Sequence, residues 1–158
     1  MGKGRDKVLG MVAWLLAAFI AYIFIYYLQF KFTGHPGSVD LFTTLTDWLG
    51  LHGHEKFMRI GTGSTELVAS ILLFIPATQV VGAALSLAIM SGAIFFHLAS
   101  PLGIDPYGDG GVLFKQACAV WLSSVVILAI RRKRVISLLE RYLPFLPLPS
   151  RLVGGMTR

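Results

Sequence analysis

Two apolar stretches of this chain each carry one ionisable side chain where a membrane-spanning helix should have none. Glu66 lies near the start of the stretch 60–76, and His97 lies near the end of the stretch 79–99. Hydrocarbon cannot hydrate a charge, so a titratable group inside such a helix indicates a functional site. A histidine beside a carboxylate can take up and release a proton near neutral pH. Glu66 and His97 are therefore the candidate catalytic residues.

The elements that must position these residues are membrane helices. Apolar segments occupy about residues 8–30, 60–76, 79–99 and 112–130. At 1.5 Å per residue, each can cross a hydrocarbon core of roughly 30 Å. The hinge Pro76-Ala77-Thr78-Gln79 is too short to recross a membrane, so the two segments beside it must be antiparallel neighbours. The pattern predicts an all-α integral membrane protein, a bundle of four transmembrane helices.

Composition supports one membrane domain covering residues 1–158. The chain is 55% hydrophobic and 14% charged, whereas soluble proteins have about a quarter charged residues. Its single cysteine, Cys118, excludes an internal disulfide and a C-x-x-C redox pair. Nothing in the sequence indicates a flavin or iron–sulfur site, and the facing pair of transmembrane histidines that a b-type haem needs is missing. We expect no covalently bound cofactor.

The net charge of +6 predicts topology rather than nucleic-acid binding. Lys3, Arg5 and Lys7 precede the first apolar segment, and residues 131–134 are all basic. Basic residues flank cytoplasmic helix ends, so both termini and the basic tail 131–158 are expected in the cytoplasm. The loop 100–111 contains no Lys or Arg, as expected of a loop on the non-cytoplasmic side of the membrane. No basic groove with interleaved aromatics appears, so nucleic acid is not an expected partner.

The first outer loop, 31–59, predicts a short amphipathic helix over about residues 38–50, lying in the membrane interface. Ser38 is the expected N-cap and Gly50 the stop. His52 and His54 follow this helix. Because no third metal ligand is evident nearby, we expect them to be solvated loop residues rather than a metal site.

Three further patterns complete the coarse architecture. Asp105 and Asp109 are read as turn residues. Small residues repeat at four-residue spacing on two helices, as expected of close-packing faces: Ala13, Ala17 and Ala21 on the first, Ala84, Ala88 and Gly92 on the third. In the tail, 135–142 predicts an interfacial helix that Pro144 ends.

Helix depth predicts that the polar residues meet in the outer half of the bundle. Glu66 comes out about 10 Å below the outer surface, and His97 and Lys115 about 5 Å. Ser86, Met90, Ala93 and His97 share one face of their helix. We expect an outward-opening pocket lined by Glu66, His97, Lys115 and Gln116, with Lys31, Arg59 and Thr62 as further ligand-binding residues.

Two interpretations of these groups remain open. Glu66 could pair with Lys115 or His97 simply to hold the helices together, as polar groups do in membranes. Alternatively, the groups form a site for a ligand with polar oxygens and an apolar body, because burying three ionisable groups costs more than one hydrogen bond returns.

Short motifs give the chain a family resemblance. Phe30-Lys31-Phe32-Thr33-Gly34 ends the first helix, Thr65-Glu66-Leu67 opens the second apolar run, and Phe96-His97-Leu98 closes the third. Over about residues 10–130 the chain resembles the DoxX family. The fourth helix departs from that pattern, because it carries Lys115-Gln116 where many members have a neutral Asn.

The resemblance implies a four-helix inner-membrane protein of bacterial type, with both termini cytoplasmic and functional residues at Lys31, Glu66 and His97. Some DoxX proteins resemble or form the membrane subunit of thiosulfate:quinone oxidoreductases. The expected function is therefore a subunit of a quinone-linked oxidoreductase that is not redox-active alone. Glu66 and His97 would bind and protonate a quinone, Lys115 would steady an anionic oxygen, and a partner subunit would supply electrons. The alternatives are a non-catalytic assembly or interaction subunit and a lipid-handling protein.

Overall fold

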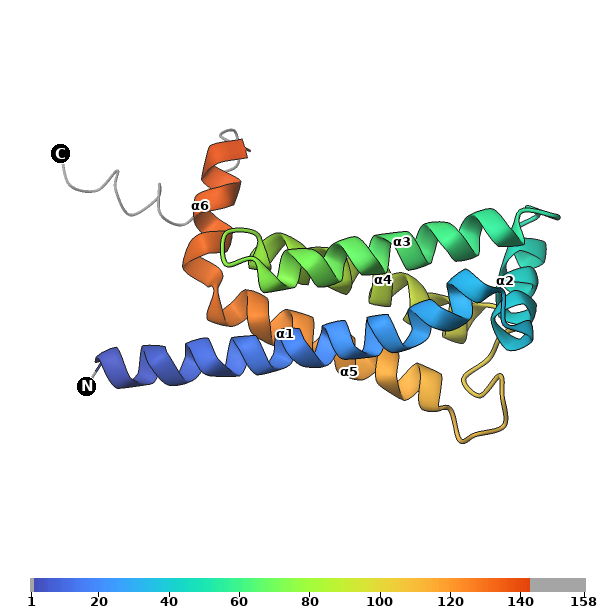
Figure 1. The fold of residues 1–158 in the computed structure, drawn as a ribbon, viewed down its shortest axis with the longest axis horizontal. Coiled ribbons are helices and arrows are strands. Elements are labelled where there is room, and N and C mark those ends of the chain that lie inside the picture. Colours follow the sequence, from blue (N-terminus) through green and yellow to red (C-terminus); the bar gives the residue numbers. More distant parts are fainter. Residues whose placement is uncertain (1, 143–158) are drawn as a thin grey trace.

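A computed structural model describes residues 2–142, which form six helices and no strand (Figure 1). In chain order these are α1 (Gly2–Thr33), α2 (Pro36–Trp48), α3 (Glu55–Phe74), α4 (Gln79–Ala99), α5 (Val112–Ile130) and α6 (Arg132–Tyr142). Within this part of the chain, α1, α3, α4 and α5 are long and apolar enough to cross a membrane. The all-helical class is confirmed, and these apolar helices indicate a multi-pass membrane protein in contact with a lipid bilayer.

The membrane-length helices surround a shared core. Helix α1 packs against α3 and α5, while α4 packs against the same two helices from the other side. Figure 1 shows the start of α1 and helix α6 at one end of the molecule, and α2 with the loop 100–111 at the other. This arrangement agrees with the predicted grouping of the loops.

The small residues of α1 lie on its packing face, as predicted. Ala13, Ala17 and Ala21 are buried, and they alternate with the large buried side chains Ile20 and Phe24. Between helices in a membrane, van der Waals packing of this kind replaces the hydrophobic effect as the source of association.

The predicted small-residue face of α4 is only partly correct. Ala84 and Ala88 are exposed, and the inward face carries Gly82, Ala83 and Ser86. Four-residue spacing identifies a stripe along a helix, but it does not say which neighbour the stripe faces. The face predicted to line the pocket does point inward, because its members Ser86, Met90 and His97 are all buried.

Helices α3 and α4 form the expected antiparallel hairpin, and Gly82 sets their closest approach. A Cβ atom at Gly82 would lie 2.7 Å from the backbone nitrogen of Leu73 and 2.9 Å from the carbonyl carbon of Leu72. Only a residue without a side chain allows the two backbones this near to one another. The hairpin is therefore held tightly at the end next to its turn.

Helix α2 begins two residues earlier than predicted and lies across the end of the bundle that carries the loop 100–111, which is called the outer end after the predicted topology. His35 is the N-cap, its Nδ1 accepting a hydrogen bond from the Gly37 backbone at 3.3 Å. Pro36, with φ fixed near its helical value, occupies the first helical position, so Ser38 is a buried residue within the helix and not the cap. Gly50 follows the helix end with φ of 72°, as its predicted role as a stop requires.

At the opposite end, the α3–α4 turn is tied to the start of α6. The Arg131 Nε donates a 2.9 Å hydrogen bond to the Oε1 of buried Gln79, and Arg134 donates to the Pro76 carbonyl. Helix α6 covers Arg132–Tyr142, so the predicted helix over 135–142 is helical and begins three residues earlier than expected. The rest of the predicted tail, from 143 to 158 and including Pro144, lies outside the described residues.

The Gly82 contact predicts a position-dependent cost for a single methyl group. Gly82→Ala should destabilise the protein by roughly 1–3 kcal/mol, because backbone atoms must move to admit the Cβ. Gly92→Ala in the same helix is the control, since a Cβ there meets nothing within 4 Å. Reversible unfolding in mixed micelles, followed by circular dichroism, measures both; equal stability of the two variants would refute the close-contact account.

Candidate functional site

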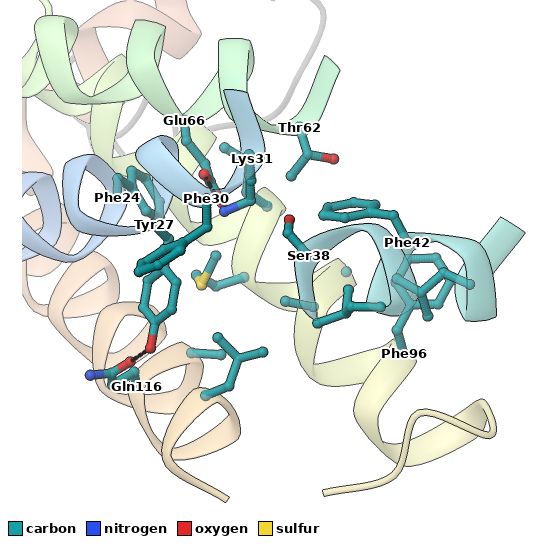
Figure 2. Close-up of a pocket in the computed structure, with 18 of the residues that line it drawn as sticks. Phe24, Tyr27, Phe30, Lys31, Ser38, Phe42, Thr62, Glu66, Phe96 and Gln116 are labelled. Atoms are coloured by element: carbon teal, nitrogen blue, oxygen red, sulfur yellow. Dashed lines mark hydrogen bonds and ion pairs between the residues drawn. The ribbon is translucent and has the colours of Figure 1, made fainter. Parts of the chain in front are cut away.

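A cavity of about 790 Å³ lies at the outer end of the bundle, bounded by helices α1 to α5 and the loop 100–111. Its wall is mostly apolar and aromatic; Phe24, Phe30, Phe42 and Phe96 surround it in Figure 2. Of the residues predicted from the sequence, five line this cavity: Lys31, Thr62, Glu66, His97 and Gln116. Lys115 and Arg59 do not line it.

Glu66 pairs with Lys31, which the sequence did not predict. The Lys31 Nζ lies 2.8 Å from the Glu66 Oε2, and the two side chains retain only 13% and 5% of their exposure. The sequence placed Lys31 just beyond the span 8–30, at the outer end of the first helix, and α1 continues to Thr33. Lys31 therefore lies in the last turn of the helix, and its flexible stem reaches inward to the carboxylate (Figure 2).

Tyr27 forms the rest of the polar wall with Gln116. The Tyr27 hydroxyl donates a 2.5 Å hydrogen bond to the Gln116 Oε1, joining α1 to α5, and the Lys31 Nζ lies 5.6 Å from the Tyr27 ring centroid. A cation at that distance is attracted by the ring. The sequence analysis did not place Tyr27 in the pocket; a sequence signal was its position one helical turn before Lys31 on α1.

Arg59 does not line the cavity but holds the end of α1 that carries Lys31. Its side chain is buried, and it donates hydrogen bonds to the Glu55 carboxylate and to the backbone carbonyl of Lys31. The carbonyls of a final helical turn have no partner within the helix, so Arg59 satisfies one of them. It fixes the end of α1 from which the Lys31 side chain extends.

His97 is fixed in one orientation by the outer loop. Its Nδ1 lies 2.6 Å from the Gly103 carbonyl oxygen, and its ring packs edge-on against Phe114 at 5.6 Å between centroids. A carbonyl oxygen can only accept, so Nδ1 must carry a hydrogen. The other ring nitrogen, Nε2, is then the atom able to take up a proton.

Lys115 lies away from this group. Its side chain is exposed, and a Cβ added at Gly110 in the loop 100–111 would lie 3.9 Å from the Lys115 Nζ. Neither of the pairings considered from the sequence, Glu66 with Lys115 or Glu66 with His97, is among the ion pairs of the described residues. Helix depth alone could not distinguish Lys31 from Lys115, because it carries no information on rotation about the helix axis.

The loop 100–111 is held in its conformation by hydrogen bonds from its own backbone to its aspartates. Asp105 accepts hydrogen bonds from the backbones of Asp109 and Gly110, and Asp109 accepts one from Val112. The loop is thus ordinary turn chemistry, as predicted. Desolvation works to raise the pKa of Asp105, but the backbone N–H groups of Gly111, Asp109 and Gly110 together outweigh it and hold the pKa below its usual value. The Tyr107 hydroxyl donates to the Gly37 carbonyl at 2.9 Å and links this loop to α2.

The loop histidines contribute nothing to a metal site in the described part of the chain. His52 bonds Asp47 at 2.9 Å at the surface, and the His54 Nδ1 lies 3.0 Å from the His52 carbonyl. Within residues 2–142, no cluster of three or more His, Cys, Asp or Glu residues could hold a metal ion.

Comparison with family models, curated proteins and solved structures finds no match to this chain. Membership of the DoxX family stays a prediction that rests on the three sequence motifs.

The Lys31–Glu66 pair predicts a strongly non-additive pair of substitutions. Lys31→Met alone leaves a buried carboxylate without its cation and should cost on the order of 3 kcal/mol. Glu66→Gln alone strands the ammonium group in the same way, whereas the double variant leaves no charge and should recover more than half of either loss. Unfolding free energies of the four proteins in one detergent complete the cycle. Additive losses would show that the two charges do not interact.

Proposed function

We propose that this protein is the membrane subunit of a quinone-linked oxidoreductase complex and that the cavity is its quinone site. The single observation that carries the proposal is the cavity wall, which is apolar and aromatic with a few convergent polar groups. That combination suits a ligand with an apolar body and polar oxygens, and the volume of about 790 Å³ lies within the range of small-molecule sites. The DoxX-like motifs point the same way, since Lys31, Glu66 and His97 belong to them.

The residues present fit a neutral ligand that carries carbonyl oxygens. An ammonium group has three N–H donors, and the bond to Glu66 uses one of those on Lys31. The remaining donors can hold a carbonyl oxygen, and the cation and carboxylate cancel each other's charge. Lys31 would thus bind the oxygen, rather than Lys115 as the sequence suggested.

His97 is the candidate proton carrier. Its Nδ1–H is held by Gly103 at 2.6 Å, which orients the ring and leaves Nε2 for proton exchange. When bound, a quinone supplies two-electron, two-proton chemistry. In the proposal a partner subunit delivers the electrons, while Glu66 and His97 handle protons within the cavity. The protein would sit in a bacterial-type inner membrane with both termini in the cytoplasm.

A non-catalytic assembly subunit is the second candidate, and one observation favours it. Ala84 and Ala88 are exposed on α4, and small residues allow a second helix to approach closely. In this alternative the bundle docks the transmembrane helix of a partner, and any redox chemistry takes place elsewhere in the complex.

Native mass spectrometry of protein released gently from its own membranes tests the proposal. A quinone-sized mass should accompany the wild type and fall by about tenfold or more in the Lys31→Met/Glu66→Gln double variant, which buries no unpaired charge. Lys115→Met is the control and should retain the ligand, because its side chain lies outside the cavity.

A stoichiometric partner protein with no small molecule would replace the quinone proposal with the assembly subunit. Full retention of the quinone by the double variant would show that the ligand is held elsewhere in the molecule.

A further inference from the structure

The α3–α4 hairpin is closed at one end and open at the other. Near the turn, Gly82 brings α4 against the backbone of Leu72 and Leu73. Toward the outer end, a Cβ atom added at Gly61 of α3 or at Gly92 of α4 would meet nothing within 4 Å. Space is therefore open beside both glycines, in contrast to the tight contact next to the turn, and this open space is here called the gap between α3 and α4.

Four small residues, two on each helix, line the cavity beside this gap. Counting outward from the contact of Gly82 with Leu73, Thr65 and Ala88 lie within about 3 Å of the same depth, and so do Gly61 and Gly92. Each of the four lines the cavity. Gly61 and Ala88 are also exposed at the surface of the protein, and Thr65 and Gly92 are half-buried. Residues that both line the cavity and reach the surface mark an opening in its wall, here called the lateral opening.

The surface around the lateral opening is apolar. Phe57 and Phe95, on either side of it, are exposed at 82% and 54%, and α3 and α4 are both membrane-length helices. Side chains of this kind are stable against lipid, whereas on a water-facing surface they would form an unfavourable apolar patch. The lateral opening therefore faces the hydrocarbon of the outer leaflet.

The water-facing end of the cavity is more obstructed. Helix α2 lies across it, with Phe42 and Leu45 packed against Leu102, and the hydrogen bond from Tyr107 to the Gly37 carbonyl bridges α2 and the outer loop. Three exposed residues, His35, Tyr107 and Asp109, also line the cavity at this end, so these contacts narrow the water-facing entrance without closing it. A molecule dissolved in the bilayer would need only to pass between Gly61, Thr65, Ala88 and Gly92.

We infer that the cavity takes a lipid-soluble ligand from the membrane through the lateral opening, with the head group inside and an apolar tail extending between α3 and α4 into the bilayer. This inference rests on the proposed function for the nature of the head group. It adds the class of ligand, a quinone with a long isoprenoid tail, and its route. Small side chains at the lateral opening leave room for the tail, and the Lys31–Glu66 pair lies beyond them at the cavity wall.

The inference is tested by filling the lateral opening. In Gly92→Phe the ring enters open space and does not disturb the Gly82 contact; Gly61→Phe fills the gap from α3 as an independent second variant. Ala84→Phe is the matched control, because Ala84 is exposed on the same stripe of α4 but does not line the cavity. Each full-length protein is placed in lipid nanodiscs and mixed with liposomes that contain either a long-tailed ubiquinone or the same head group without a tail. Quinone bound per protein is then measured over time by mass spectrometry.

In Gly92→Phe and Gly61→Phe, uptake of the long-tailed ubiquinone by the protein should slow by at least about tenfold. Uptake of the tailless head group should stay as in the wild type. Ala84→Phe should load both probes normally. Wild-type loading of the tailed quinone by Gly92→Phe and Gly61→Phe would overturn the lateral route but leave the quinone site standing. Equal slowing of both probes would show that the ring merely fills the cavity, and would also overturn the route. If the wild type takes up neither probe, the proposed function itself fails.

Discussion

A charge in hydrocarbon must be compensated where it lies, and this constraint shapes the outer half of the bundle. The Glu66 carboxylate is buried on α3, and the Lys31 ammonium group reaches it from α1 at 2.8 Å. That contact requires α1 to remain helical past the predicted end of its span. It also requires the end of α1 to be fixed, which Arg59 achieves by binding the Lys31 carbonyl. The ion pair, the length of α1 and the burial of Arg59 are therefore one structural solution rather than three separate features.

The cavity lies beyond the point at which α3 and α4 are in close contact. Gly82 draws α3 and α4 together next to their turn, and the buried alanines of α1 allow a similarly close fit to its neighbours. At the other end, large aromatic side chains such as Phe24 and Phe96 form the wall, and α2 covers the space that results. Tight packing of small residues near the turn supplies the association that an open outer half cannot.

Sequence periodicity and length predicted the membrane-length helices, the antiparallel hairpin, the short helix in the first outer loop and the turn role of Asp105 and Asp109. They also placed Glu66 and His97 at one end of the bundle. They could not predict the partner of Glu66, because depth along a helix leaves its rotation undetermined, and Lys31 and Lys115 lie at similar depths. The direction of the stripe containing Ala84 and Ala88 was undetermined for the same reason. The N-cap of α2 was wrong because Pro36 can begin a helix earlier than the serine that follows it.

The cation beside Glu66 is Lys31 and not Lys115, and this changes the kind of ligand that the cavity favours. A lysine free of any carboxylate would attract an anion, and an anion would have to arrive from water. Lys31 is instead neutralised by Glu66, so the wall combines hydrogen-bond donors with no net charge from that pair. Such a wall favours an uncharged molecule with polar oxygens, and uncharged molecules with long apolar tails dissolve in the bilayer. The electrostatics of the wall and the gap between α3 and α4 are thus two independent reasons to expect a ligand that comes from the membrane.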